Sequence, residues 1–590
     1  MPGLFGILAK HPDVPEERLR ILGHRMAAAL VTTPWLTTEP WNAPQFSGGR
    51  VHLGLANPSP QPLISTDGAL AAWFDGQLYG ANGASGATPS ADTVAGLVAD
   101  CGAALAGADG VFAIAAFDAD AGVLTLATDR LGFRPLYWTE TADWFAYACE
   151  VKALLAILDS LPRVDQVSLR QFFTFDYMLG ERSWWEGIQL LPPAAHWRVS
   201  GDSRQESRYW CFEDIRPSPR EEPEVVAELW GLWRQAVHQR AHPGPSPLLL
   251  SGGLDSRLVF AELVEQGCQV TPVTFGTAGC RDVVIAARCA RMARQRQCVV
   301  PITERNWWDA RPAAIWQTDG LVNGLHLHVA VALEQMRIGN AWTLKHSTGD
   351  VLFGGSGHRL FPITTGQSAG GKDWIAARDE FLSQRAYDNP FFRNTEVAEI
   401  SRGDCDRYLG GPSVDCFILG MGQRRWTLAG LLAMMGYCEV VNPGASLPIL
   451  QLMLGGLDDR QRTGHRFYAR FLCEAYPRFF RTVPWCKTGE GLAEPSLVRA
   501  VRRLALRTGF RVGMSRATRN FADYDRLAAT ARVAERMAGT ELVADEVMDG
   551  ALRAALQRRH ETPIRTRTLL AILTLETYLR RAAGVVSLGD

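Results

Sequence analysis

The residues of this chain that could do chemistry begin at positions 247–257, which read Pro-Leu-Leu-Leu-Ser-Gly-Gly-Leu-Asp-Ser-Arg. The three leucines predict the end of a buried strand, and the apolar residues 258–263 predict a helix. Glycines in the loop between them allow close backbone approach, and a helix start presents unpaired N–H groups. A phosphate is the natural ligand of such a turn. Asp255 adds a carboxylate that could hold Mg²⁺ against that phosphate.

An ordinary strand-to-helix turn is the alternative interpretation of this segment. We favour a phosphate site because strand, glycine loop, acid and helix occur together and in this order. The segment is not the phosphate loop of kinases, since the lysine of G-x-x-x-x-G-K-[ST] is missing.

The length and composition of the whole chain limit the kind of protein in which such a site can lie. Its 590 residues predict at least two domains, because single cores stop growing near ~250–300 residues. With 47% hydrophobic residues, 21% charged residues and a formal net charge of −1, the composition gives no argument for nucleic acid or a membrane as partner. No signal peptide is evident, and no apolar run of ~18 residues predicts a membrane span. We expect a cytoplasmic protein.

The cysteines do not predict a metal centre. There are twelve, with no C-x-x-C pair. Cys280, Cys289 and Cys298 are evenly spaced but lack the spacing of zinc ligands. We interpret all twelve as buried cytosolic thiols.

The patterning divides the chain into two parts. Short β-like runs separated by Gly, Pro and Asp predict packed, mostly antiparallel sheets up to about residue 210; the clearest are at 51–55, 70–76, 110–117 and 123–128. The proline-rich, charged segment 216–223 predicts an interdomain linker. Alternating helices and strands follow, predicted at 225–240 (helix), 270–275 (strand) and 283–293 (helix). From about residue 307 the sequence pattern predicts mostly helices.

Several segments together resemble a known family, the class B asparagine synthetase superfamily, over nearly the full length. Besides Ser-Gly-Gly-Leu-Asp-Ser, they are 109–113 (DGVFA), 129–137 (DRLGFRPLY), 150–154 (EVKAL), 186–193 (EGIQLLPP) and 347–355 (STGDVLFGG). The resemblance implies an N-terminal Ntn-type amidotransferase-like β-sandwich with helices, residues 1–215. It implies an α/β adenine-nucleotide α-hydrolase-like (PP-loop) synthetase domain, rich in helices, at residues 225–590.

Departures from the family pattern fall in the N-terminal half. Glutamine-using members carry a cysteine nucleophile at residue 2, where this chain has Pro2. The asparagine-glycine segment that serves the oxyanion is Asp75-Gly76 here, and a carboxylate cannot donate a hydrogen bond. The arginine that clamps glutamine is not recognisable around 51–62. We therefore expect no glutaminase activity and a domain retained as scaffold.

In the C-terminal half the resemblance implies ATP and Mg²⁺ as cofactors. Asp255 and Asp350 would hold the metal between the phosphates, and the N–H groups of 251–256 would hold the pyrophosphate. For Asp350, a plain turn aspartate is the alternative. The expected nucleotide contacts are Leu250, Ser251, Gly252, Gly253, Leu254, Asp255, Ser256, Phe275 and Gly349.

The same resemblance implies roles for four further residues. Lys487 would stabilise the negative transition state, unless it is an ordinary exposed lysine. Glu439 would orient the substrate or hold the domains together. Glu380 would deprotonate the attacking amine, although a solvated helix glutamate is the simpler interpretation. Asp282 resembles an acid near the nucleotide.

One arginine-rich segment and one apolar segment are most simply interpreted as structural. Seven arginines at 499–519 could contact phosphates or an acidic peptide, but a solvated helix face is the simpler interpretation. The apolar segment 564–581 predicts a helix packed on the core.

The resemblance leaves three activities for a member without glutaminase, all of them ATP-dependent and AMP-forming. Lasso-peptide cyclases join a peptide's N-terminal amine to an Asp or Glu side chain; β-lactam synthetases close a small ring; divergent asparagine synthetases use free ammonia. The length, the Pro-Gly start and the Ser-Gly-Gly-Leu-Asp-Ser-Arg form are most similar to a lasso-peptide cyclase. The tyrosine–glutamate base pair of β-lactam synthetases cannot be placed.

The cyclase interpretation implies a precursor peptide as substrate after its leader is removed, with a leader peptidase and a leader-binding protein as partners. From another class of protein, an inactive scaffold of a biosynthetic complex stays open, although intact Asp255, Asp350 and Lys487 argue against it.

Overall fold

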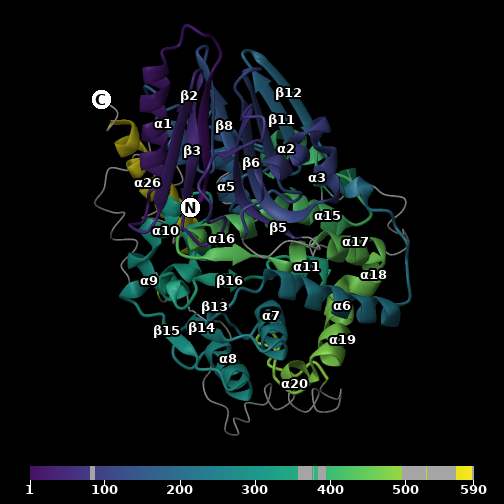
Figure 1. Cartoon of the computed structure of the whole chain (residues 1–590). Helices are drawn as coiled ribbons and strands as arrows, with labels where there is room; N and C mark the ends of the chain where they lie inside the picture. The colour runs from purple at the N-terminus through teal and green to yellow at the C-terminus, as the bar shows by residue number, and fades with distance from the viewer. Residues whose placement is uncertain are drawn as a thin grey trace.

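The computed structural model describes residues 1–79, 87–355, 375–376, 378–379, 381–382, 394–493, 527 and 566–587. Two six-stranded antiparallel sheets form the N-terminal domain (Figure 1). The first has the order β10–β8–β9–β1–β3–β2: β10 Gln189–Leu190, β8 Tyr137–Glu140, β9 Trp144–Ala148, β1 Gly3–Ala9, β3 Phe46–His52 and β2 Thr37–Ala43. The second has the order β12–β11–β7–β6–β5–β4: β12 Ser203–Arg208, β11 Ala195–Ser200, β7 Val123–Thr128, β6 Asp109–Asp118, β5 Leu70–Tyr79 and β4 Leu63–Ile64.

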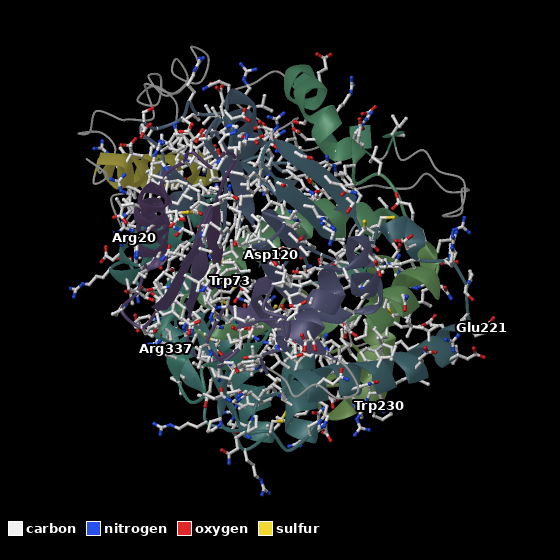
Figure 2. All side chains as sticks on the ribbon, turned by 45° about the horizontal axis from the view of Figure 1, so that its top comes forward. Arg20, Trp73, Asp120, Glu221, Trp230 and Arg337 are labelled. Carbon is white, nitrogen blue, oxygen red and sulfur yellow. The ribbon has the colours of Figure 1, made fainter. Side chains whose placement is uncertain are left out.

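The two sheets pack face to face, because alternate residues of each strand are apolar and point inward. Phe46 of one sheet stacks on Phe117 of the other, with ring centroids 4.7 Å apart. Trp73 lies inside this sandwich, whereas Arg20, Asp120 and Arg337 lie at the surface (Figure 2). Helices cover the outer faces: α1 Glu16–Leu30 and α4 Val151–Leu155 on the first sheet, and α2 Ala91–Val98 with α3 Ala103–Gly107 on the second.

The C-terminal domain lies below the sandwich in Figure 1 and is built around parallel strands. The order β13–β14–β15 joins Ser246–Leu249, Val270–Gly276 and Cys298–Pro301, and a separate parallel pair joins β16 Trp342–Leu344 to β17 Glu439–Val441. The helices that follow these strands or surround them include α6 Glu222–Arg240, α7 Leu254–Glu265, α8 Arg281–Met292, α10 Arg311–Gln317, α11 Gly349–Leu352, α16 Leu428–Met435, α17 Leu447–Gly455, α19 Arg466–Ala475 and α20 Pro477–Phe480.

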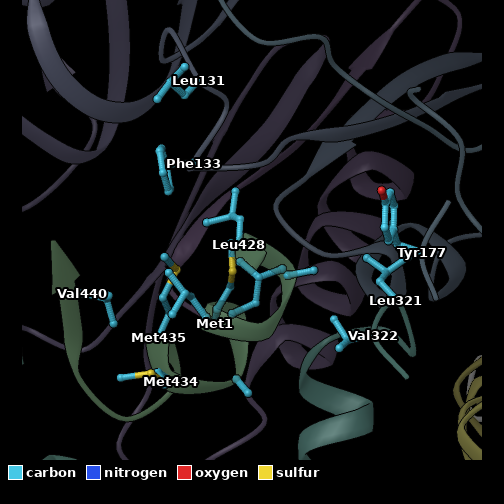
Figure 3. Packing of buried hydrophobic residues seen from close by; sticks show 14 of the residues in the cluster. Met1, Leu131, Phe133, Tyr177, Leu321, Val322, Leu428, Met434, Met435 and Val440 are labelled. Atoms are coloured by element: carbon cyan, nitrogen blue, oxygen red, sulfur yellow. The ribbon is translucent and has the colours of Figure 1, made fainter. Parts of the chain in front are cut away.

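One apolar core continues from the first domain into the second. Leu131 and Phe133 of the sandwich face Leu428, Met435 and neighbouring side chains of the helical domain (Figure 3). The last helix, α26 Thr566–Ser587, packs on α4 and on α10, so the C-terminal end of the described chain also holds the two domains together. This confirms the helix predicted at 564–581.

A buried ionic group reinforces the same interface. The Lys152 ammonium lies 2.7 Å from Glu150 and 3.0 Å from Asp319 of the C-terminal domain, and none of the three side chains is more than 3% exposed. The linker is likewise held in place: the N–H groups of Ser218 and Arg220 donate to the carbonyls of Gly455 and Gly456 at the end of α17.

Most element predictions hold, and the errors are at the ends of elements. Strands β5, β6 and β7 and helices α6 and α8 are where the periodicity places them. Strand β3 ends at His52, three residues before its predicted end. Helix α7 begins at Leu254 rather than Leu258, because an acid in a first helical turn is favourable and Gly253 can serve as the N-cap.

The prediction for the cysteines is right about their chemistry and only partly right about their burial. All twelve are free thiols. Cys101 is exposed, because it lies in a short turn between α2 and α3 at the surface, and Cys211 is half-buried.

Candidate functional site

The early start of α7 changes where the residues of the glycine loop lie. Leu254, Asp255 and Ser256 form the first turn of the helix, and only Leu250 to Gly253 remain as loop. Gly253 is the N-cap and provides no side-chain hydrogen bond to the turn. The positive end of a twelve-residue helix therefore has no side-chain cap.

Three of the six N–H groups predicted to hold pyrophosphate already have partners in the chain. Ser251 N–H donates to Ser256 Oγ at 3.1 Å, and Gly253 N–H donates to Ser251 Oγ at 3.1 Å. Gly252 N–H donates to Asp282 Oδ1 at 2.9 Å. The predicted set of pyrophosphate-binding N–H groups is therefore smaller. The N–H groups of the first turn of α7, at 254–256, are the ones suited to a phosphate. Asp282 shapes the loop that leads into this turn.

The two predicted metal ligands lie in the first turns of two helices that touch, Asp255 in α7 and Asp350 in α11. Gly349 is the contact, because a Cβ at this position would lie 2.4 Å from Asp255 Oδ1. Only glycine lets the second acidic loop approach Asp255 so closely. Burial raises the pKa of Asp255 to about 6, and the negative charge of Asp350 adds to the shift. The structure thus brings together two carboxylates from segments that are far apart in the sequence.

Asp255 has two neighbours that the sequence patterns did not reveal. The Tyr468 hydroxyl, buried at the start of α19, donates to Asp255 Oδ1 at 2.7 Å. Lys345 follows β16 and is close enough for Asp255 to raise its pKa, although burial lowers that pKa overall. The position of Lys345 two residues before the Ser-Thr-Gly-Asp segment was the one available signal for it.

Asp350 has a more open setting. Its side chain is 45% exposed, and its Oδ1 lies 2.7 Å from His465 Nε2 and 3.8 Å from Lys487 Nζ. Lys487 is 52% exposed and lies 5.3 Å from the centre of the Trp485 ring. The predicted phosphate lysine is therefore at the predicted acidic loop, with its ammonium accessible.

These residues fit Mg²⁺ held jointly with a polyphosphate. No group of three or more His, Cys, Asp or Glu side chains that could hold a metal by itself occurs in the described part of the chain. Two adjacent carboxylates leave the other positions of a magnesium ion to phosphate oxygens and water, which is the usual arrangement for this ion. Burial is the main cause of the raised pKa of Asp255, and a cation beside this carboxylate would favour the charged form that burial disfavours.

Glu439 lies at the domain interface. It is the first residue of β17, is 3% exposed, and pairs with Arg134 of the sandwich. Gln77 Nε2 donates to Glu439 Oε1 at 3.2 Å. Burial raises the pKa of Glu439, and Arg134 opposes that shift. Of the two predicted roles, these contacts favour holding the domains together.

The same arginine accounts for the aspartate at the altered oxyanion segment. Arg134 Nη1 lies 3.4 Å from Asp75 Oδ2, so one buried guanidinium bridges Asp75 of the first domain and Glu439 of the second. Burial alone would lower the pKa of Arg134, but the two carboxylates raise it. Asp75 is thus part of an interdomain ion group.

A buried arginine lies beside the stretch where no clamp was recognised. Arg50 immediately precedes it in β3, opposite Leu4 of β1. Its guanidinium is already engaged: Nε contacts Glu39, and the two terminal nitrogens donate to the carbonyls of Asn57 (2.8 Å) and Ser59 (2.9 Å). The segment in which a clamp was sought begins one residue after this arginine. The guanidinium of Arg50 is, however, already bound by groups of the protein itself.

Some predicted residues cannot be placed. Glu380 and the arginines at 499–519 lie outside the described residues. Phe275 lies near the end of β14, opposite Val300 of β15, at the same edge of the parallel sheet as the glycine loop.

Comparison with protein families decides the assignment. Residues 37–210 match a glutamine amidotransferase domain, and residues 229–398 match an asparagine synthase domain. The chain therefore carries a domain similar to glutamine amidotransferases followed by a domain similar to asparagine synthases. The N-terminal sandwich is the Ntn-type amidotransferase domain, as expected, and the helical domain with the parallel strands is the synthase domain.

Individual proteins are similar to this chain over parts of their length. Asparagine synthetase [glutamine-hydrolyzing] 3 of Bacillus subtilis (strain 168) is 32% identical over 155 residues, which are 26% of this chain and 25% of that protein. Asparagine synthetase [glutamine-hydrolyzing] 1 of the same organism is 23% identical over 214 residues, 36% of this chain and 34% of that protein. The amidase chyE of Penicillium rubens is 28% identical over 170 residues, 27% of this chain and 25% of that protein. The matches thus span only about a quarter to a third of these relatives.

Among the described helices, none is long and apolar enough to cross a membrane.

Proposed function

We propose that this chain is an ATP-dependent carbon–nitrogen ligase that works without glutamine. The observation that carries the proposal is the uncapped first turn of α7 beside Asp255, Asp350 and Lys487. Positive helix end, paired carboxylates and exposed ammonium together suit a departing pyrophosphate. The names of the similar relatives support an asparagine synthetase-like reaction.

The reaction follows from what carboxylates and amines need. A substrate carboxylate oxygen attacks the α-phosphorus of ATP, and pyrophosphate leaves with its electron pair. The amine then attacks the acyl carbon, AMP leaves, and the amine proton is lost to a base. Bound Mg²⁺ would neutralise charge on the phosphates. From this chain, the N–H groups of 254–256 and Lys487 would bind the pyrophosphate, while Asp255 and Asp350 would hold the metal.

The amine, in this proposal, comes from a substrate. Three features of the first domain support this. Pro2 has no thiol, Asp75 is tied to Arg134 and cannot donate to an oxyanion, and the guanidinium of Arg50 is engaged within the protein.

The finer proposal is a lasso-peptide cyclase, which joins a peptide's N-terminal amine to an Asp or Glu side chain. Likeness in the motif Ser-Gly-Gly-Leu-Asp-Ser-Arg supports it. Ring closure then requires the peptide to be held folded, which gives the reacting groups a high effective concentration. A precursor freed of its leader would be the substrate, with a leader peptidase and a leader-binding protein as partners.

The cyclase proposal predicts a defined set of products. The protein, ATP, Mg²⁺ and the candidate precursor with a free N-terminus should give AMP, pyrophosphate and a peptide lighter by one water. Mass spectrometry of the peptide and chromatography of the nucleotides would read both outcomes. An unchanged peptide together with asparagine made from aspartate and ammonia would replace the cyclase by an asparagine synthetase, whereas ADP as product would contradict the adenylation mechanism.

A second prediction concerns nitrogen from glutamine. Glutamine should not be hydrolysed at a rate tied to ATP use, and Pro2→Cys alone should not create activity, because Asp75 still cannot stabilise an oxyanion. Glutamate release measured with and without ATP tests this. Stoichiometric glutamate release by the unaltered protein would show that the first domain is an active glutaminase.

A further inference from the structure

His465 has a backbone conformation that few side chains tolerate. Its φ is 62° and ψ is 20°, and the preceding Gly464 has φ 72°, so two consecutive residues are left-handed. A non-glycine residue in this region is strained, and such residues collect at functional sites. The turn is nevertheless firmly anchored. The fully buried Arg462 contacts Asp415 (2.5 Å) and Asp459 (2.7 Å).

The strained turn delivers the His465 imidazole to the acidic loop. Nε2 lies 2.7 Å from Asp350 Oδ1, and the side chain is 4% exposed. The ring lies against Gly354, where a Cβ would be only 2.7 Å from Nε2. Its centroid is 5.3 Å from that of Trp485, two residues before Lys487. Gly354 makes this close approach sterically feasible, and Gly464 adopts the positive φ that the turn requires.

Asp350 needs such a support. Its side chain is 45% exposed and faces the like charge of Asp255 on the adjoining loop, so repulsion and solvent both favour rotation away. A hydrogen bond from the imidazole to Asp350 Oδ1 fixes the orientation of this carboxylate beside Asp255. Outer partners of this kind orient metal ligands, and their loss weakens metal binding about 10- to 100-fold.

We propose that His465 is a positioning residue that fixes the Asp350 carboxylate for Mg²⁺ at the pyrophosphate end of the site. The inference rests on the proposed function, since it assumes that Asp350 is a ligand. It assigns the imidazole a role through Asp350, with no contact to the reacting atoms.

The backbone strain supplies a sharp test. His465→Gly removes the imidazole and leaves the turn with the residue best suited to its φ, so the backbone conformation is kept while the packing of the buried ring is lost. His465→Asn tolerates the left-handed conformation and keeps a donor. The full-length variants are compared with the unaltered chain by calorimetric titration of ATP, with Mg²⁺ and with EDTA, in the absence of a second substrate.

We expect His465→Gly to keep the affinity for ATP in EDTA, while the concentration of Mg²⁺ needed for half-maximal gain in ATP affinity rises at least about tenfold. His465→Asn should fall between it and the unaltered chain. An unchanged Mg²⁺ dependence in His465→Gly would overturn this inference and leave the ligase standing. An equal loss of ATP affinity in EDTA and with Mg²⁺ would make the histidine structural and overturn the inference equally. If the unaltered chain gains no ATP affinity from Mg²⁺, the proposed function itself is wrong.

Discussion

Replacing Asp255 by asparagine should abolish ATP–pyrophosphate exchange, with a loss of at least about a thousandfold, or about 4 kcal/mol of transition-state stabilisation. The carboxylate lies beside the first turn of α7 and touches Gly349 of the second acidic loop, so its charge acts where pyrophosphate departs. Asp350→Asn should have the same effect. Exchange of radiolabelled pyrophosphate into ATP measures it for both variants.

Stability provides the control for this result, because the fold should not suffer. Burial raises the pKa of Asp255 from 3.8 to about 6. A raised carboxyl pKa stabilises the folded state below pH ~4 and loses that contribution as the pH rises through 6, so at pH 7 the charged group costs at most about 3 kcal/mol.

The side chain introduced by Asp255→Asn carries no such charge, and its amide oxygen can still accept the hydrogen bond from Tyr468. Without Mg²⁺ at pH 7, this variant should therefore unfold at an equal or higher denaturant concentration than the unaltered chain. The difference should vanish near pH ~4, where the aspartate is protonated in the folded state. Exchange near the normal level in both aspartate variants would exclude this site.

Replacing Arg134 by methionine should strongly destabilise the domain interface. Asp75 and Glu439 would remain buried without their counter-charge, and breaking a buried ion pair in this way costs about 3–5 kcal/mol. Arg20→Met is the matched control, since Arg20 pairs with Glu17 on the exposed face of α1 and should change stability by less than about 1 kcal/mol. Equilibrium unfolding in urea measures both.

Removing the charges of the two carboxylates that face Arg134 should restore much of the lost free energy of unfolding. Asp75→Asn and Glu439→Gln added to Arg134→Met leave no unpaired charge, so the triple variant should be more stable than the single one. Arg134→Met with normal stability, or a triple variant less stable than the single one, would show that the three residues do not act as one group.

The sequence alone determined the features that depend on neighbouring residues. Alternation of apolar residues placed β5, β6 and β7, and helical periodicity placed α6, α8 and α26. The glycine loop, its acid and the Ser-Thr-Gly-Asp segment stood out because a phosphate turn is built from consecutive residues. Pro2 and Asp75 could be judged without a structure, because a missing thiol or donor is a property of the residue type.

Only the tertiary structure decided which groups meet. The two aspartates are approached by Tyr468, His465 and Lys345, and no periodicity or spacing in the sequence encodes such contacts. Hydrogen bonds within the loop assign the N–H groups of 251–253 to the protein and leave the first turn of α7 without a side-chain cap. Side-chain ion pairs depend on three-dimensional proximity, so the contacts of Glu439 were decided by Arg134, which lies 305 positions earlier in the chain.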